Sequence, residues 1–583
     1  MGFAHAPCLP FAAPLPTPPS TLPKIRASLR LMFLRAFLLL LTAASAHASA
    51  TPPDDALRGY VLGRYASTDD STAAAQRFFA TALAADPSQP AVTRRAFDSA
   101  VEAGDKSRAI ALARQLTADG TGDSNVALVL LADAVSRKDW AGVGRARAGI
   151  ASAGYAAVVE PIVTAWTLFA QGNHDQALAR LEPGGFTGFA RSYVAEQRAH
   201  MLAADGQYAA AATAYADLRV GTGAGFALLR LGEADALAQA GDGDAALKLL
   251  VGDDANVSAA RQRLAAGRRI GALAPDARRG LAWAMARLAT DLSREQPADL
   301  ALVFARVSTF LAPENAATWL VLGDVLAGSA RHEAVLVALA NVRRDDPLFV
   351  TADARRAEAL EAVGRNAEAG MLLQAAATAH GADADDWARL ADWHRRADRF
   401  AEAIAAYDRA IAVADRGAAP RWGLYFLRGS MTERAGDWPA AEADLRAALA
   451  LSPDEPMVLN YLGYSMLDRG VTGDEPAALI ARAAKLRPGD GGIIDSLGWS
   501  QFKDGRFDEA VATLEKAAAL EPTDPTVADH LGDAYWQAGR RIEARFRWRA
   551  ALGLEPDAKL KAALNRKLEI GRDAALALAP STK

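Results

Sequence analysis

Small, apolar and polar residues recur along much of the chain with a period of about 34 residues. Prolines mark this period most plainly, at Pro453, Pro488, Pro522 and Pro556. Between two such prolines the pattern predicts two helices, separated by a Gly-Arg turn at 505–506 and again at 539–540. A repeat of this length is typical of a solenoid, in which each pair of helices packs on its neighbours, rather than of several globular domains.

Constant positions within each unit have physical roles that fit two closely packed helices. Gly498 and Gly532 each follow a leucine in the first helix, where a small residue lets the second helix approach. Ala510 and Ala544 offer the same small surface from the second helix. The closing proline ends the unit because it disfavours the α conformation of the residue before it.

This pattern resembles the tetratricopeptide repeat (TPR) family. One unit, WARLADWHRRADRFAEAIAAYDRAIAV, carries the characteristic positions in register at Trp387, Leu390, Ala391, Ala403, Tyr407 and Ala410. The phrases LNYLGYSMLDRG, IIDSLGWSQFKDG and VADHLGDAYWQAG are similar to the C-terminal repeats of exported TPR proteins of α-proteobacteria. The resemblance implies an all-α fold, a right-handed superhelical α-solenoid of stacked helix–turn–helix repeats.

The resemblance also suggests how the chain is divided. We predict an N-terminal extension with a signal peptide at 1–50, TPR units at 51–122, degenerate TPR-like repeats at 123–315, a well-formed array at 316–558, and a capping helix with a tail at 559–583. The last helix carries Lys559, Lys561, Arg566 and Lys567. A polar terminal helix of this kind would seal the apolar end of a solenoid.

Residues 32–50, MFLRAFLLLLTAASAHASA, have the layout of a secretory signal peptide. We expect Met32 to be the true start, and the alternative is that residues 1–31 form a long basic n-region. A lipoprotein anchor would need a cysteine after the apolar stretch, and the sequence has none there. Since no later apolar run reaches about 20 residues, we expect an exported, soluble protein without a membrane span, periplasmic if the organism is Gram-negative.

Composition and charge exclude several classes of function. The 65 Lys+Arg and 69 Asp+Glu residues give a net charge of −4, without the basic stripe that a nucleic-acid-binding protein needs, so nucleic acid is not an expected partner. The only cysteine, Cys8, precedes the expected cleavage point, which excludes a disulfide framework and a cysteine-rich zinc site.

No catalytic or cofactor motif stands out. The six histidines after residue 50 are scattered, and His332-Glu333 lacks the second histidine of a zinc-protease motif because Leu336 stands in its place. The sequence contains no G-x-S-x-G elbow, no P-loop and no GxGxxG loop. We therefore expect a protein that is not an enzyme and that uses no metal or cofactor.

By resemblance to the family, two positions four residues apart on each first helix face the concave side of the solenoid. In the last three units these are Asn460 and Tyr464, Asp495 and Trp499, and Asp529 and Asp533, with Phe502 and Trp536 one turn further on. We call these eight residues the ladder. Its acceptors and aromatic rings would suit an extended protein segment with basic or amide groups and apolar anchors. The expected function is therefore an exported scaffold or adaptor that binds protein or peptide partners.

Other interpretations stay open at this point. Tyr464, Trp499 and Trp536 could instead pack between repeats, and the ladder aspartates could be solvated or capping carboxylates. The protein could also be an accessory subunit of an envelope machine for polysaccharide or outer-membrane assembly, with glycan stacking on the aromatic rings. An enzyme would require a compact, non-helical domain within residues 123–275.

Overall fold

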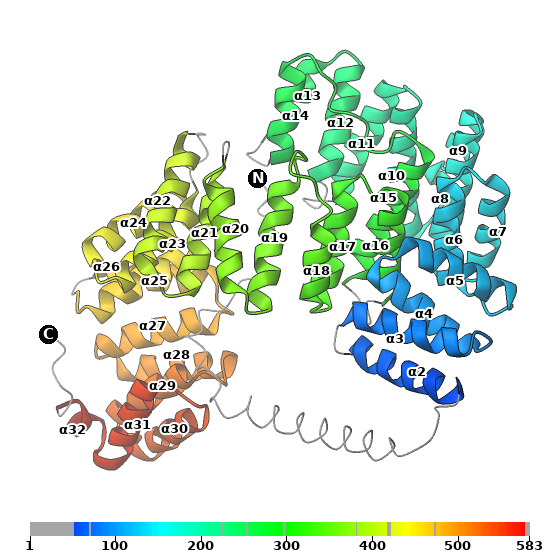
Figure 1. Ribbon diagram of the computed structural model, residues 1–583. Coiled ribbons are helices and arrows are strands. Elements are labelled where there is room, and N and C mark those ends of the chain that lie inside the picture. The colour runs from blue at the N-terminus through cyan, green and yellow to red at the C-terminus, as the bar shows by residue number, and fades with distance from the viewer. Residues whose placement is uncertain are drawn as a thin grey trace. The chain divides into compact units, whose positions relative to one another are not determined.

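The computed structural model describes residues 52–68, 71–222, 227–251, 255–294, 299–379, 382–416, 421–471 and 474–577. The predicted signal peptide and N-terminal extension lie outside these residues. The chain divides into two compact units, one formed by the described residues up to Ala382 and the other by those from Asp383. We call them the first unit and the second unit. In each unit, consecutive helices pack against each other (Figure 1).

The first unit is built from helices, with one short 3-10 helix. In chain order these are α2 (Pro52–Thr68), α3 (Thr72–Ala85), α4 (Pro90–Ala103), α5 (Lys106–Ala118), α6 (Ser124–Ser136), α7 (Trp140–Ile150), α8 (Ala156–Ala170), α9 (His174–Arg180), η1 (Pro183–Gly185), α10 (Gly188–Ala204), α11 (Tyr208–Thr222), α12 (Ala227–Gln239), α13 (Gly243–Leu249), α14 (Ala255–Ala265), α15 (Ala277–Leu292), α16 (Asp299–Leu311), α17 (Ala316–Gly328), α18 (His332–Leu339), α19 (Phe349–Ala362) and α20 (Asn366–Ala377).

The second unit is also built from helices. Its helices are α21 (Ala384–Arg396), α22 (Phe400–Arg416), α23 (Trp422–Arg434), α24 (Trp438–Leu451), α25 (Pro456–Asp468), α26 (Asp474–Leu486), α27 (Gly491–Lys503), α28 (Phe507–Leu520), α29 (Pro525–Gln537), α30 (Arg541–Gly553), α31 (Ala558–Ile570) and α32 (Arg572–Ala577). The described residues contain no strand, and the prediction of an all-α fold of stacked helix pairs is confirmed.

Local sequence explains where these helices begin and why they pack in pairs. Asp524 caps α29 by accepting hydrogen bonds from the backbone amides of its first turn, and Pro525 occupies the first helical position. Gly539 ends the following turn with a φ of 80°, which favours glycine. A Cβ atom on Gly532 would lie 2.5 Å from the Trp548 ring of α30. The predicted role of this glycine in close helix approach is therefore confirmed.

The first unit has one feature that repeat stacking alone does not predict. The hairpin of α15 and α16 contacts α4, α6, α8 and α10, which are the first helices of four earlier pairs. Lys106 donates a hydrogen bond to the Phe310 carbonyl oxygen at 2.7 Å, and Arg306 donates one to the Glu102 carbonyl oxygen at 2.5 Å. These first helices are thus covered by the chain's own later helices.

The segment in which a hidden domain would lie is also helical. The described residues between 123 and 275 form α6 to α14, apart from η1 and the connecting turns. Among all the described residues, no helix is both long enough and apolar enough to cross a bilayer.

Candidate functional site

The ladder lies on three first helices that are neighbours in the second unit. Helix α25 contacts α27, and α27 contacts α29. Each of the three helices has a glycine that faces the second helix of the same repeat. These glycines are Gly463, Gly498 and Gly532, and the ladder residues occupy equivalent positions around them. The structure therefore places all eight residues on three neighbouring first helices, but it gives them different surroundings.

The two aspartates of α29 are buried and already paired with cations. Lys567 of α31 places its Nζ atom 2.7 Å and 2.8 Å from the two carboxylate oxygens of Asp529. The same ammonium group lies 2.9 Å from Asp533, and Arg572 of α32 forms a second ion pair with Asp533 at 2.9 Å. Burial raises the pKa of Asp529, the nearby Asp533 carboxylate adds to the rise, and Lys567 opposes it. These carboxylates are neither solvated nor helix caps.

Asp495 joins the ladder to a histidine from the next repeat. His530 Nδ1 lies 2.8 Å from Asp495 Oδ2, and the imidazole stacks on the Trp499 ring with centroids 4.0 Å apart. Burial alone would lower the pKa of His530, but the Asp495 carboxylate outweighs burial and raises it above its usual value. His530 therefore pairs with the preceding repeat rather than with Asp533 of its own helix.

The first two acceptors of the ladder lack hydrogen-bond partners. Asp495 Oδ1 and Asn460 Oδ1 are buried and have none. A buried acceptor without a hydrogen-bond partner costs about 1–3 kcal/mol. Burial and the charge of Asp495 raise the pKa of Tyr464 to about 12, so the phenol keeps its proton. This end of the ladder therefore differs from the end on α29.

The aromatic residues of the ladder combine packing with partial exposure. Trp499 is half-buried and stacks on Phe502 at 4.8 Å as well as on His530. Trp536 is also half-buried, lies 5.4 Å from Trp548, and donates a hydrogen bond to Asp573 at 3.0 Å. Both rings thus have structural contacts, as the packing interpretation expects, and both keep an exposed edge.

Sequence reasoning missed the residues that complete this cluster, namely His530, Lys567 and Arg572. For Lys567 the sequence did hold a signal. Residues 560, 564 and 567 follow helical spacing, with Leu564 fully buried and Leu560 half-buried. Lys567 is therefore on the buried stripe of α31 and is 6% exposed, whereas it was expected to be part of a polar outer surface. Arg572 follows a glycine turn and has no such signal.

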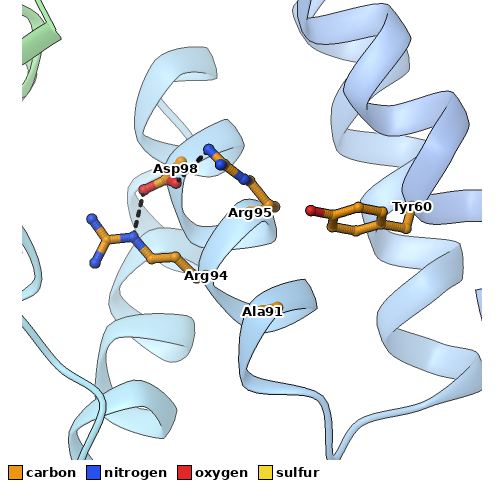
Figure 2. Close-up of a pocket in the computed structure, with 5 residues that line it drawn as sticks. All are labelled: Tyr60, Ala91, Arg94, Arg95 and Asp98. Carbon is orange, nitrogen blue, oxygen red and sulfur yellow. Dashed lines mark hydrogen bonds and ion pairs between the residues drawn. The ribbon is translucent and has the colours of Figure 1, made fainter. Parts of the chain in front are cut away.

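A surface hollow of about 370 Å³ lies elsewhere, in the first unit. Figure 2 shows its lining, Tyr60 of α2 and Ala91, Arg94, Arg95 and Asp98 of α4. The charged groups pair with each other or nearby: Arg94 lies 2.9 Å from Asp98 and 2.6 Å from Asp123. The charged side chains that line the hollow are therefore neutralised by their ion-pair partners. In the described part of the chain, no three His, Cys, Asp or Glu residues are grouped so as to hold a metal ion.

Comparison with known proteins identifies one of the repeats. The tetratricopeptide repeat family model matches residues 494–524, which include most of α27 and all of α28. A TPR repeat-containing protein of Pseudomonas aeruginosa is 40% identical over 83 residues. The matched segment is a tetratricopeptide repeat, so the chain is TPR-containing. The alignment with that relative spans 14% of this TPR protein and 14% of the relative. The family suggests a protein-interaction scaffold, and TPR proteins are generally non-catalytic.

Solved structures resemble this TPR protein only in fold. The APC/C hetero-tetramer Cut9–Hcn1 is 14% identical with a TM-score of 0.36, covering 89% of this chain and 96% of that chain. MamA AMB-1 is 23% identical with a TM-score of 0.25, covering 31% and 96%. YrrB, described as a TPR protein with an unusual peptide-binding site, is 18% identical with a TM-score of 0.27, covering 33% and 97%. Likeness of this degree bears on neither ligand nor partner.

Proposed function

We propose that this TPR protein is an exported, non-catalytic scaffold that binds extended protein segments along the ladder of the second unit. One observation carries the proposal: the ladder carboxylates Asp529 and Asp533 hold cationic side chains of the chain itself. A surface that binds ammonium and guanidinium groups within the chain offers the same chemistry to a partner.

A partner would add new contacts at the end of the ladder formed by α25 and α27. Asn460 and Asp495 each keep an acceptor without a hydrogen-bond partner, and Tyr464 and Trp499 are half-buried beside them. Basic or amide groups of a partner would donate to the acceptors, while its apolar side chains would pack on the rings. An acidic segment would meet carboxylates and is disfavoured.

The proposed compartment rests on the signal-peptide pattern of residues 32–50 alone. Export would place the protein in the periplasm of a Gram-negative organism. A role as an accessory subunit of an envelope machine is the second candidate, favoured by the half-buried Tyr464 and Trp499, because aromatic rings with exposed edges also stack on sugars.

Selection from a random peptide library by the purified full chain tests the proposal. We expect enrichment of peptides that combine lysine or arginine with apolar residues, and at least tenfold weaker binding of the selected peptides to Asp495→Asn and to Trp499→Ala. Lys516→Ala is the matched control, because Lys516 is exposed on α28 of the same repeat. A glycan array probed with the same protein tests the second candidate.

Three results would count against the scaffold proposal. They are a library without enrichment, enrichment of acidic peptides, and selected peptides that bind both ladder variants as tightly as wild type. Glycan binding without peptide binding would replace it with the second candidate. Thermal melting of each variant separates loss of binding from loss of fold.

A further inference from the structure

The chain turns back over the ladder after α31. Helix α31 ends at Ile570, and Gly571 has a φ of 81°, which favours glycine. A Cβ atom on Gly571 would lie 2.7 Å from the Trp536 ring, so the backbone passes closer to this ring than another residue would allow. The two residues that follow, Arg572 and Asp573, are thereby held against the ends of α27 and α29.

Arg572 makes an ion pair and a contact with an aromatic ring. Its Nε atom lies 2.9 Å from Asp533 Oδ2, and its Cζ atom lies 4.7 Å from the centroid of the Phe502 ring. The side chain is 12% exposed, so the pair is largely shielded from water. A planar guanidinium combines an ion pair with stacking on an aromatic ring better than an ammonium group does.

Asp573 is recognised by two donors of α29. Its Oδ2 atom accepts a hydrogen bond from Trp536 Nε1 at 3.0 Å, and its Oδ1 atom accepts one from Gln537 Nε2 at 2.9 Å. Both carboxylate oxygens are therefore used, although the side chain is 64% exposed. The arrangement selects a carboxylate directly after the arginine.

We propose that Phe502, Asp533, Trp536 and Gln537 form a site for an arginine–acidic-residue step in a protein partner. We call it the Arg-Asp site, and in this structure Arg572-Asp573 occupies it in cis. The inference rests on the proposed function and names the chemistry of the partner. A partner segment with the sequence Arg-Asp or Arg-Glu displaces residues 572–573 and then extends along the ladder toward Trp499 and Asp495.

The contacts on either side of Gly571 explain why this occupant can be replaced. Helix α31 is anchored by the fully buried Leu564 and by the buried Lys567. Beyond Gly571, Arg572 is held by an ion pair and one ring contact, and the 64% exposed Asp573 is held by two hydrogen bonds. Segments held mainly by such contacts open without unfolding of the rest of the protein.

A fluorescein-labelled peptide with the sequence of residues 567–577, KLEIGRDAALA, tests the Arg-Asp site by fluorescence anisotropy. The full chain carrying Arg572→Ser and Asp573→Ser has the site empty, and we expect it to bind the peptide at least tenfold more tightly than wild type. Adding Asp533→Asn to this variant should remove the gain. In the peptide, changing the Arg-Asp step to Lys-Asp, Arg-Asn or Asp-Arg should weaken binding at least fivefold.

A second measurement on the wild-type chain keeps the test decisive if the emptied variant is unstable. Saturating peptide should increase hydrogen exchange of the amides of residues 572–575, while the amides of α31 stay protected. Equal binding to emptied and wild-type chains, equal binding of the Asp-Arg peptide, or unchanged exchange would overturn the proposal. If library peptides still bind at Trp499 and Asp495 in that case, the scaffold function stands and only the Arg-Asp site fails.

Discussion

The two units use the same helix pairs but treat their first helices differently. In the first unit, α15 and α16 cover the first helices α4, α6, α8 and α10. One large hydrophobic cluster runs from Ala66 to Ala359, beside a smaller one within residues 231–260. In the second unit the hydrophobic core includes separate clusters around residues 426–466, 459–527 and 502–564. Separate clusters are typical of repeats that contact only their neighbours. The first unit has therefore closed on itself, whereas the second keeps the organisation of an open array.

The closed unit shows how the chain satisfies acidic groups on its first helices. Glu196 of α10 is buried, receives the Arg287 guanidinium of α15 at 2.8 Å, and accepts a hydrogen bond from the Trp283 indole. Asp529 of α29 receives Lys567 in a comparable way. In both units a buried carboxylate on a first helix binds a cation from a later helix. Asp495 Oδ1 and Asn460 Oδ1 have no hydrogen-bond partner, and we propose that a separate molecule supplies the donors there.

The largest expected loss of stability comes from removing the cation that pairs with Asp529 in the second unit. Lys567→Met keeps the length of the side chain but leaves the buried Asp529 carboxylate without its ion pair, which costs about 4 kcal/mol. We expect the second unit to unfold at lower urea concentration while the first unit is unchanged. Hydrogen exchange measured along urea titration, peptide by peptide, resolves the two units.

Lys561→Met is the control, because Lys561 is exposed on the same helix. A loss of stability equal in the two variants, or one spread over both units, would show that Lys567 is not what stabilises the ladder carboxylates.

The next largest loss of stability is expected when the packing of α15 on α8 in the first unit is disturbed. A Cβ atom on Gly280 of α15 would lie 2.1 Å from the ring of Trp166, which is fully buried on α8. Gly280→Ala therefore forces the hairpin of α15 and α16 away from α8, at a cost of about 2–3 kcal/mol. We expect lower thermal stability of the first unit only, measured by hydrogen exchange at α8 and α15.

Gly144→Ala on α7 is the matched control. Nothing lies within 4 Å of a Cβ atom at Gly144, so this change should stabilise the helix by about 0.5–1 kcal/mol. If Gly280→Ala were as harmless, the close contact between α15 and α8 would be wrong.

The smallest effect depends on pH. The pKa of His530 is raised by Asp495, with Asp529 and Asp533 adding to the rise, so the protonated form stabilises the folded state. This stabilisation is complete below the unfolded pKa of 6.5 and is lost as pH rises through the higher folded pKa. We expect the second unit of wild type to lose stability over that interval, and His530→Gln to show no such loss. Equal pH dependence of the two proteins would contradict the assignment.

The sequence predicted the helix pairs because their determinants are local. These determinants are Gly532, the turn at Gly539 and the proline that closes each repeat. Each acts within a single repeat, so one period of the sequence is enough to find them. The covering of the first unit could not be predicted, since Gly280 meets Trp166 across more than a hundred residues of sequence with no periodic sign. The ladder residues were found by register, but their pairing with Lys567 and Arg572 depends on where α31 and α32 turn.

Photo-crosslinking in the producing cell tests the central claim most directly. Benzoylphenylalanine replaces Tyr464 in the ladder, Lys516 on the outside of the same unit, or Leu168 on α8 in the closed unit. We predict protein adducts from position 464 at least tenfold above those from 516 and 168, with the adducts reduced by Asp495→Asn. Adducts at 168 or 516 equal to those at 464, or none at 464, would contradict the account that the second unit holds the partner.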